Sequence, residues 1–342
     1  MGSGYNRVGT GTPPPGGRVA LIVAGPTCSG KSALALALAQ RVKGTIINAD
    51  SMQVYRDLRI LTARPGPQDE ARVPHALYGV LPAARTGSVA WWREQAMACA
   101  HAAWDAGRVP VFCGGTGMYF RALTDGLADI PQPPDAIRAR ARAMVEHLGP
   151  EGAHAELRTL DAGTAATVRP TDGQRIARAL EVRLATGHGL AWWRREAVLP
   201  PLAARFIAIR LHPPREALRA AIARRFHAMV EQGALDEVAH LLEQGLPPDL
   251  PAMRAHGVPE LAAMLRGTMT LADATARAIT LTGQYTKRQA TWFAHHALAR
   301  PADTLVQEKR FEIHPDAQQM ERCEKKIISF VMNGIDAAPG FP

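Results

Sequence analysis

The sequence predicts an α/β fold in which a P-loop parallel sheet is flanked by helices and carries a helical insertion domain. The first observation is Val19–Ala24, an apolar run that leads into a G-x-x-x-x-G-K-S loop and then into the Ala/Leu-rich segment 33–42. Two further apolar runs, 45–49 and 109–113, also end in polar or Gly-rich loops. Strands that alternate with helices form parallel sheets, whose ligands bind at the carboxyl ends of the strands.

The loop after the first strand has the residues of a phosphate cradle. Its glycines let successive backbone N–H groups point at phosphate oxygens, and the helix that follows adds the positive end of its dipole. Lys31 supplies a mobile positive charge, and the Ser32 hydroxyl can hold Mg²⁺. A Gly-rich turn between two core elements is the plain structural alternative, but the strand-to-helix context favours a polyphosphate or diphosphate ligand. The loop consists of Gly25, Pro26, Thr27, Cys28, Ser29, Gly30, Lys31 and Ser32.

The rest of the chain continues this alternation. Residues 88–106 predict a helix that Ser88 caps and Gly107 stops, and 206–211 has strand character. Between them, an Arg- and Ala-rich helical segment begins with the prolines from Pro131 on. We expect later helices that pack on the sheet at 215–232, 234–244 and 271–297. The predicted parts are a disordered leader (1–17), a first core part (18–130), the helical insertion (131–200), a second core part (201–300) and a loose C-terminal tail (301–342).

The length, charge and cysteine content limit which classes of protein and which partners we expect. The 342 residues, 47% of them hydrophobic, suit one large α/β domain or two coupled ones. A net charge of +9 and a pI near 9.8 favour a polyanionic partner such as nucleic acid, although solubility alone also accounts for them. Four cysteines without C-x-x-C spacing suggest free thiols, and the short apolar runs predict a cytoplasmic protein with no membrane partner. The histidines lack metal-ligand spacing, so zinc is not predicted.

Asp50 is the carboxylate best placed to act beside the loop. The strand over 109–113 ends in Gly114–Gly117 without the acidic residue that nucleotide hydrolases place there. Asp50 follows the strand over 45–49, and we expect its carboxyl end to lie beside that of the first strand. The side chain would orient Mg²⁺ or act as a general base, whereas the structural alternative is a residue that merely begins a turn.

Five sequence blocks together resemble one family, the tRNA dimethylallyltransferases. They are GPTCSGKS, DSMQVY, GGTGMYF, DGQRIARALEV at 172–182 and YTKRQATWF at 285–293, and they follow the family's order from Val19 to Phe293. The resemblance implies transfer of a dimethylallyl group from dimethylallyl diphosphate to N6 of adenosine 37, in tRNAs that read codons starting with U. It also implies Mg²⁺ as cofactor. We expect a monomer, although the sequence itself does not fix the oligomeric state.

The resemblance assigns roles to single residues. Lys31 would neutralise the diphosphate, Asp50 would be the general base, and Thr116 and Arg225 complete the catalytic set. For Arg225 the alternative is a solvated helix face, and for Trp292 and Phe293 it is a place in the core. The implied tRNA contacts are Asp50, Ser51, Met52, Gln53, Thr116, Arg138, Gln174, Arg175, Ile176, Ala177, Arg178, Lys287, Arg288, Gln289 and Trp292.

The chain departs from the family pattern in a few places. Residues 254–259 (RAHGVP) lack the aromatic and the basic residue usual after this glycine, so contacts there are in doubt. Cys28 stands where alanine is usual, and Ser32 replaces the commoner threonine. Competing functions are a P-loop nucleotide or small-molecule kinase, an isopentenyltransferase acting on free adenine nucleotides, and a non-catalytic RNA-binding module.

Overall fold

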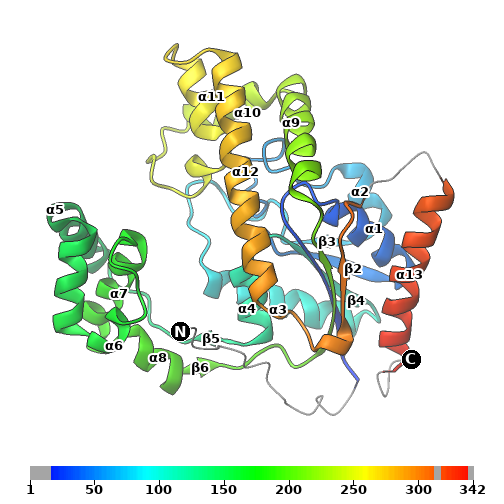
Figure 1. Ribbon diagram of the computed structural model, residues 1–342, viewed down its shortest axis with the longest axis horizontal. Coiled ribbons are helices and arrows are strands. Elements are labelled where there is room, and N and C mark those ends of the chain that lie inside the picture. The colour runs from blue at the N-terminus through cyan, green and yellow to red at the C-terminus, as the bar shows by residue number, and fades with distance from the viewer. Residues whose placement is uncertain (1–16, 312–316, 338–342) are drawn as a thin grey trace. The chain divides into compact units, whose positions relative to one another are not determined.

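The computed structural model describes residues 17–311 and 317–337, and these form two compact units (Figure 1). The first unit runs to Asp125 and resumes at Leu202, and the second unit is Gly126–Pro201. The predicted leader lies outside the described residues except for Gly17. No helix in the described ranges combines the length and the apolar character that crossing a membrane requires.

Six parallel strands form the sheet of the first unit, in the order β3-β2-β4-β1-β7-β8. All four strands predicted from apolar runs are confirmed to within one residue. β4 lies between β1 and β2, so the strand that carries Asp50 is two places from the P-loop strand rather than beside it. The strands are β1 (Val19–Ala24), β2 (Gly44–Asn48), β3 (His75–Ala76), β4 (Val109–Gly114), β7 (Arg205–Leu211) and β8 (Thr304–Gln307).

Helices cover both faces of this sheet because side chains of its strands alternate between two apolar cores. Residues 19, 21 and 23 of β1 pack with α1 (Lys31–Arg41) and α13 (Ala317–Asp336). Residues 20, 22 and 24 face α3 (Val89–Asp105) and α4 (Gly117–Thr124). Ser88 caps α3 by accepting a hydrogen bond from the Trp91 N–H, as predicted. The short α2 (Pro67–Arg72) precedes β3.

The helices after β7 pack mainly on one another, whereas we expected them to pack on the sheet. Contacts run from α12 to α9 and α11 and from α10 to α11 (Figure 1). Apolar residues of α9, α10 and α11 extend the core on this face of the sheet, and in the last turns of α12 Phe293 packs edge-on against Phe120 of α4. The helices are α9 (Arg215–Glu231), α10 (Ala234–Glu243), α11 (Val258–Leu265) and α12 (Leu271–His295), with a 3₁₀ turn at Ala252–Arg254.

The prediction of a loose tail after Arg300 is wrong for the described part of that segment. A 3₁₀ turn (Pro301–Asp303) leads into β8, which pairs with β7 along Ala208–Leu211. The following helix α13 buries Ile327, Val331 and Ile335 in the core beside α1. These residues are four apart, and this helical period drives the packing even though the surrounding residues are polar.

A buried ion-pair cluster fixes the start of this segment to β7. The Asp303 carboxylate is 4% exposed and accepts hydrogen bonds of 2.6 Å from Arg205 and from Arg300. Burial by itself would raise the pKa of Asp303, but these hydrogen bonds and the two positive charges lower it overall. The pair therefore stabilises the fold above the unfolded-state pKa of about 4, and that stability is lost as the pH falls through the lower pKa of the folded state.

We expect Asp303→Ala to lower the free energy of unfolding by about 2–3 kcal/mol at neutral pH, because it removes two charged hydrogen bonds. Urea unfolding followed by circular dichroism at pH 7 and pH 3 measures this. The difference between variant and wild type should shrink at pH 3, and an equal difference at both pH values would contradict the role of the charge.

The second unit is a small helical domain with its own core. It begins at Gly126 rather than at residue 131 because β5 (Leu127–Ala128) pairs antiparallel with β6 (Val198–Leu199). The long α5 (Asp135–Leu160) breaks at Gly149–Pro150 and packs along α7 (Gly173–Thr186), with α6 (Ala162–Ala165) and α8 (Leu190–Glu196) beside them.

Candidate active site

The loop 25–30 joins β1 to α1 in the geometry of an anion cradle. Cys28 and Gly30 both have left-handed backbone angles, with φ of 64° and 89°. Gly30 admits no side chain, because a Cβ there would lie 1.8 Å from the Phe311 carbonyl oxygen. Alternation of such conformations turns successive N–H groups toward one concavity, which is how backbone loops bind phosphate.

Two buried polar groups in the cradle, the Lys31 ammonium and the Ser29 hydroxyl, lack partners among the described residues that would compensate for their burial. Lys31 is 9% exposed, and in the described part of the chain its ammonium takes part in no ion pair. The buried Ser29 hydroxyl likewise makes no hydrogen bond to any described residue. Burying an unpaired charge is costly. The cradle is therefore arranged for a bound anion.

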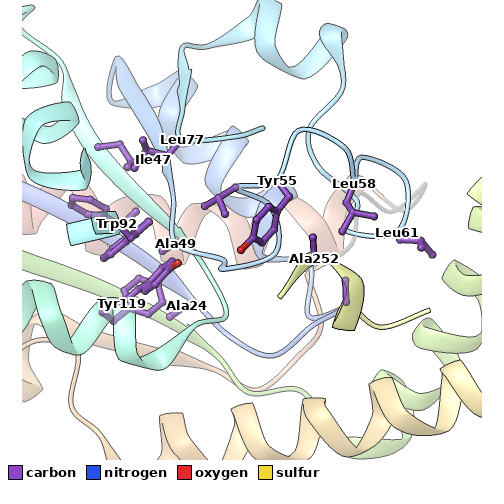
Figure 2. Packing of buried hydrophobic residues seen from close by; sticks show 14 of the residues in the cluster. Ala24, Ile47, Ala49, Tyr55, Leu58, Leu61, Leu77, Trp92, Tyr119 and Ala252 are labelled. Atoms are coloured by element: carbon purple, nitrogen blue, oxygen red, sulfur yellow. The ribbon is translucent and has the colours of Figure 1, made fainter. Parts of the chain in front are cut away.

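Asp50 lies at the carboxyl end of β2, in a turn that Asn48 holds. The buried Asn48 amide accepts a hydrogen bond from the Asp50 N–H at 2.8 Å and donates one to the Asp50 carbonyl oxygen at 3.0 Å. Trp92 donates to the Asn48 carbonyl oxygen and stacks on Tyr119, and both rings lie near Ala49 (Figure 2). Asp50 Oδ1 accepts from the Met52 N–H, and Oδ2 makes no hydrogen bond to a described residue. One carboxylate oxygen is thus left for chemistry.

The pKa of the buried Cys113 thiol is affected by the charges of both Lys31 and Asp50. Burial chiefly raises the pKa of its thiol to about 11, the Asp50 charge adds to this, and Lys31 and a hydrogen bond with Ser32 oppose it. Lys31, Asp50 and Ser32 thus all influence the pKa of this thiol. β4, which carries Cys113, lies between the strands of the P-loop and of Asp50.

Thr116 joins the Asp50 turn to the loop after β4. Its Oγ1 accepts a hydrogen bond from the Ser51 N–H at 2.9 Å, and its own N–H donates to the Ala49 carbonyl oxygen. Tyr285 of α12 also hydrogen-bonds Thr116; burial first, and then the Asp50 charge, raises the pKa of this phenol well above its usual value. Tyr285 therefore stays protonated at neutral pH.

Gln289 binds the P-loop to the loop after β4. Its side chain is 5% exposed and accepts hydrogen bonds from the Thr27 N–H at 2.8 Å and from the Thr27 hydroxyl, while its amide donates to the Gly115 carbonyl oxygen at 2.9 Å. We predicted Gln289 as a tRNA contact, but these bonds make it a brace between two loops of the site. A glutamine in a helical motif gives no sign of such distant partners.

Arg225 reaches the P-loop from α9. Its guanidinium lies 3.7 Å from the Cys28 sulfur and donates to the Thr62 carbonyl oxygen. Thr62 belongs to the loop that holds Gln53, whose amide donates to the carbonyl oxygens of Thr62 and Ala63 and is itself buried. The structure thus places Arg225 beside the cradle, and places Gln53 inside the loop that supports Arg225.

The other predicted contacts of α12 lie on its surface. Lys287 and Arg288 are exposed, and Arg288 lies over the Tyr285 ring. Trp292 is half-buried and stacks on His296, whereas Phe293 belongs to the core. A cavity of about 490 Å³ opens between α9 and α12, and Lys287, Arg215 and Arg219 are among its lining residues. In residues 254–259, the block that differs from the family pattern, the His256 ring contacts the Tyr285 ring.

The predicted contacts in the second unit lie mostly along α7. Gln174, Arg175 and Arg178 are exposed, and the two arginines pair with Asp172 and Glu181. Ile176 is fully buried in the core of this unit, which is at odds with the tRNA contact predicted for it, and Ala177 is half-buried beside it. Arg138 pairs with Asp135 at the start of α5.

The side chains near Asp50 suit Mg²⁺ better than a metal that needs a full protein cage. No cluster of three or more His, Cys, Asp or Glu in the described ranges has metal-site geometry. Mg²⁺ takes one or two protein oxygens and completes its shell with water and substrate phosphates. The exposed Ser32 hydroxyl at the start of α1 is one such oxygen.

Solved structures share this architecture. The full-length tRNA isopentenylpyrophosphate transferase of Bacillus halodurans superposes with a TM-score of 0.65 at 29% identity, covering 94% of this chain and 97% of that one. A eukaryotic dimethylallyltransferase acting on tRNA superposes with a TM-score of 0.76 at 25% identity, covering 92% of this chain and 80% of that one.

Sequence comparison gives the same family. A family model described as IPP transferase matches residues 53–296, and one described as isopentenyl transferase matches 17–73. A tRNA dimethylallyltransferase of Gluconacetobacter diazotrophicus is 64% identical, covering 95% of this chain and 97% of that protein, and one of Gluconobacter oxydans is 58% identical, covering 94% and 96%. The fold and the cradle define a P-loop transferase of the α/β class. The chain belongs to the tRNA dimethylallyltransferase family.

Proposed function

We propose that this chain transfers a dimethylallyl group from dimethylallyl diphosphate to N6 of adenosine 37, in tRNAs that read codons starting with U. One observation carries the proposal: the cradle after β1 holds a buried Lys31 that forms no ion pair with a described residue, and Asp50, with an open carboxylate oxygen, follows β2 at the same carboxyl edge of the sheet. The cradle suits a diphosphate leaving group, and the carboxylate suits an attacking amine. The names of the relatives support tRNA as the acceptor and dimethylallyl as the group transferred, and the cradle supports a diphosphate as its carrier.

The cradle would stabilise the leaving group. As N6 attacks the allylic carbon, the new C–N bond forms, the C–O bond breaks, and its electron pair departs with the diphosphate. Cations that already surround the diphosphate stabilise this growing charge more than they stabilise the ground state. Lys31, the loop N–H groups and Arg225 would serve in this way.

Asp50 would take the proton that N6 loses. An exocyclic amine on a purine is a poor nucleophile because its lone pair is delocalised into the ring, and a positioned carboxylate typically contributes 10²- to 10⁴-fold to such a step. The Asn48 and Met52 bonds fix the Asp50 turn and leave Oδ2 free to accept. Thr116 would hold this turn beside the target base.

Mg²⁺ is the proposed cofactor, and the Ser32 hydroxyl would help to hold it. When bound, it would offset part of the negative charge of the diphosphate. The exposed Lys287 and Arg288, the half-buried Trp292 and the exposed face of α7 would contact the tRNA, through phosphate charge and base stacking. We propose a monomer that works in the cytoplasm, where its tRNA substrate is found.

The test is to incubate the protein with Mg²⁺, dimethylallyl diphosphate and an unmodified tRNA of this class, and to measure nucleoside masses. A gain of one dimethylallyl group at adenosine 37 is the expected result. Prenyl transfer to AMP instead would favour an isopentenyltransferase of free adenine nucleotides. Consumption of ATP, by phosphate transfer to an acceptor or by hydrolysis, without prenyl transfer would favour a kinase or a hydrolase. Binding of tRNA without any turnover would leave only an RNA-binding module.

Gln289→Glu should lower kcat/KM for dimethylallyl diphosphate about tenfold. The carboxylate would lose the hydrogen bond to the Gly115 carbonyl oxygen and bring negative charge beside the diphosphate cradle. Steady-state kinetics at saturating tRNA measure the effect. Gln284→Glu, which makes the same change at an exposed position of the same helix, is the control, and an equal loss in both variants would contradict the brace.

A further inference from the structure

The segment after β8 lies against the back of the P-loop. The Phe311 N–H donates a hydrogen bond to the Ser29 carbonyl oxygen at 3.0 Å. The Arg310 Nε donates to the Cys28 carbonyl oxygen at 2.7 Å. Both residues lie beyond residue 296, where the family match ends, so no motif of the sequence drew attention to them.

These two bonds engage the carbonyl groups of the part of the loop that is hardest to hold. Cys28 adopts a left-handed conformation, which disfavours any residue with a Cβ, so contacts outside the loop must maintain it. A backbone loop attracts an anion through its N–H groups and repels it through its carbonyl oxygens. Bonds that keep the Cys28 and Ser29 carbonyls on Arg310 and Phe311 therefore favour the anion-binding state of the loop.

The surroundings of Arg310 also point to an anion. Arg225 contacts the sulfur of the same Cys28 whose carbonyl Arg310 holds. Partial burial lowers the pKa of Arg310 first, and the charges of Arg224 and Arg225 lower it further, opposed by Cys28. Positive groups crowded at one loop repel one another, and a bound diphosphate would relieve that repulsion.

We propose that Arg310 is a positioning residue of the diphosphate site, acting through its hydrogen bond to the Cys28 carbonyl oxygen. The inference rests on the proposed function in one respect only, namely that the P-loop takes a diphosphate. It adds a support from the C-terminal segment to a site otherwise built from the P-loop, α9 and α12.

A pair of variants separates the hydrogen bond from the charge. In glutamine the amide nitrogen is at the same number of bonds from the backbone as the arginine Nε, so Arg310→Gln can keep the hydrogen bond while it removes the charge. In Arg310→Met the side chain has the same length as glutamine but carries no hydrogen-bond donor. Titration calorimetry with inorganic pyrophosphate and Mg²⁺ measures the site without tRNA. We expect Kd to rise about tenfold in Arg310→Met and to stay within about twofold of wild type in Arg310→Gln. The exposed Lys309→Met controls for loss of charge from the same segment.

Two results would overturn the proposal. Unchanged binding in Arg310→Met would mean that the loop needs no brace, and equal losses in Arg310→Met and Arg310→Gln would mean that the guanidinium charge acts directly. Arg310→Ala replaces Arg310→Met if the latter lacks a native circular dichroism spectrum. Prenyl transfer to tRNA by the wild type is scored separately, so a wild type that binds pyrophosphate but transfers nothing would overturn the proposed function and leave the brace intact.

Discussion

Asp50→Asn is expected to lower kcat for prenyl transfer by about 10²- to 10⁴-fold. Asparagine keeps the side-chain oxygen that accepts from the Met52 N–H, so the turn should survive. It loses the oxygen that would accept the N6 proton at neutral pH. Single-turnover transfer to tRNA measures the loss, and affinity for tRNA, measured by filter binding, should stay within about twofold because one neutralised carboxylate removes no phosphate contact.

Asp57→Asn is the matched control for this change. Asp57 lies in the loop that follows Asp50 and accepts hydrogen bonds from the Ala83 N–H and from Gln244, away from the cradle. Its variant should retain nearly full activity. If Asp50→Asn also kept wild-type turnover, the carboxylate would be a turn residue only, which is the structural alternative that the sequence left open.

Lys31→Met should lower kcat/KM for dimethylallyl diphosphate by about 10²- to 10³-fold, comparable to the loss of an electrostatic contact to a developing negative charge. Methionine fills a similar volume, so the buried stem keeps its packing. The variant should unfold at the same temperature as the wild type or a higher one, because an unpaired buried ammonium no longer has to be accommodated.

Two comparisons check the assignment of Lys31. Lys43→Met removes an exposed charge just after the same helix and should change neither activity nor unfolding temperature. Affinity of Lys31→Met for tRNA should stay within about twofold of wild type. Parallel losses of tRNA affinity and diphosphate use would mean that the loop takes RNA rather than the diphosphate.

The sequence predicted the longer elements of the fold well. β1, β4 and β7 are apolar runs bounded by turn residues, and α3 has the Ser88 cap that its sequence indicated. β3 has two residues and β8 four, which is too short for an apolar pattern to stand out. β8 and α13 were missed because β8 is held by β7 and by the ion pair of Asp303 with the distant Arg205, and α13 by the core beside α1, which is also distant in the sequence.

For the candidate site, the sequence indicated where several side chains lie but not how the site is built. Lys31 and Arg225 lie at the cradle and Asp50 at a strand end, as their motifs indicated. Gln289 was assigned to RNA because amides suit bases, yet its hydrogen-bonding groups are used within the protein. Arg310 lies in no motif. Both act through partners that only the folded chain brings within reach.

The strand order has a consequence for how the protein is made. β1, which carries the P-loop, pairs on one side with β4 and on the other with β7, and Val19 meets Arg205 across the whole insertion. During synthesis on the ribosome, β1 therefore remains an unprotected edge until β7 has been translated, while the second unit, with mostly local contacts, can fold first. Slow translation before residue 205 should expose the nascent chain to chaperones and proteases, and a diphosphate can stabilise this enzyme only once nearly all of it has left the ribosome.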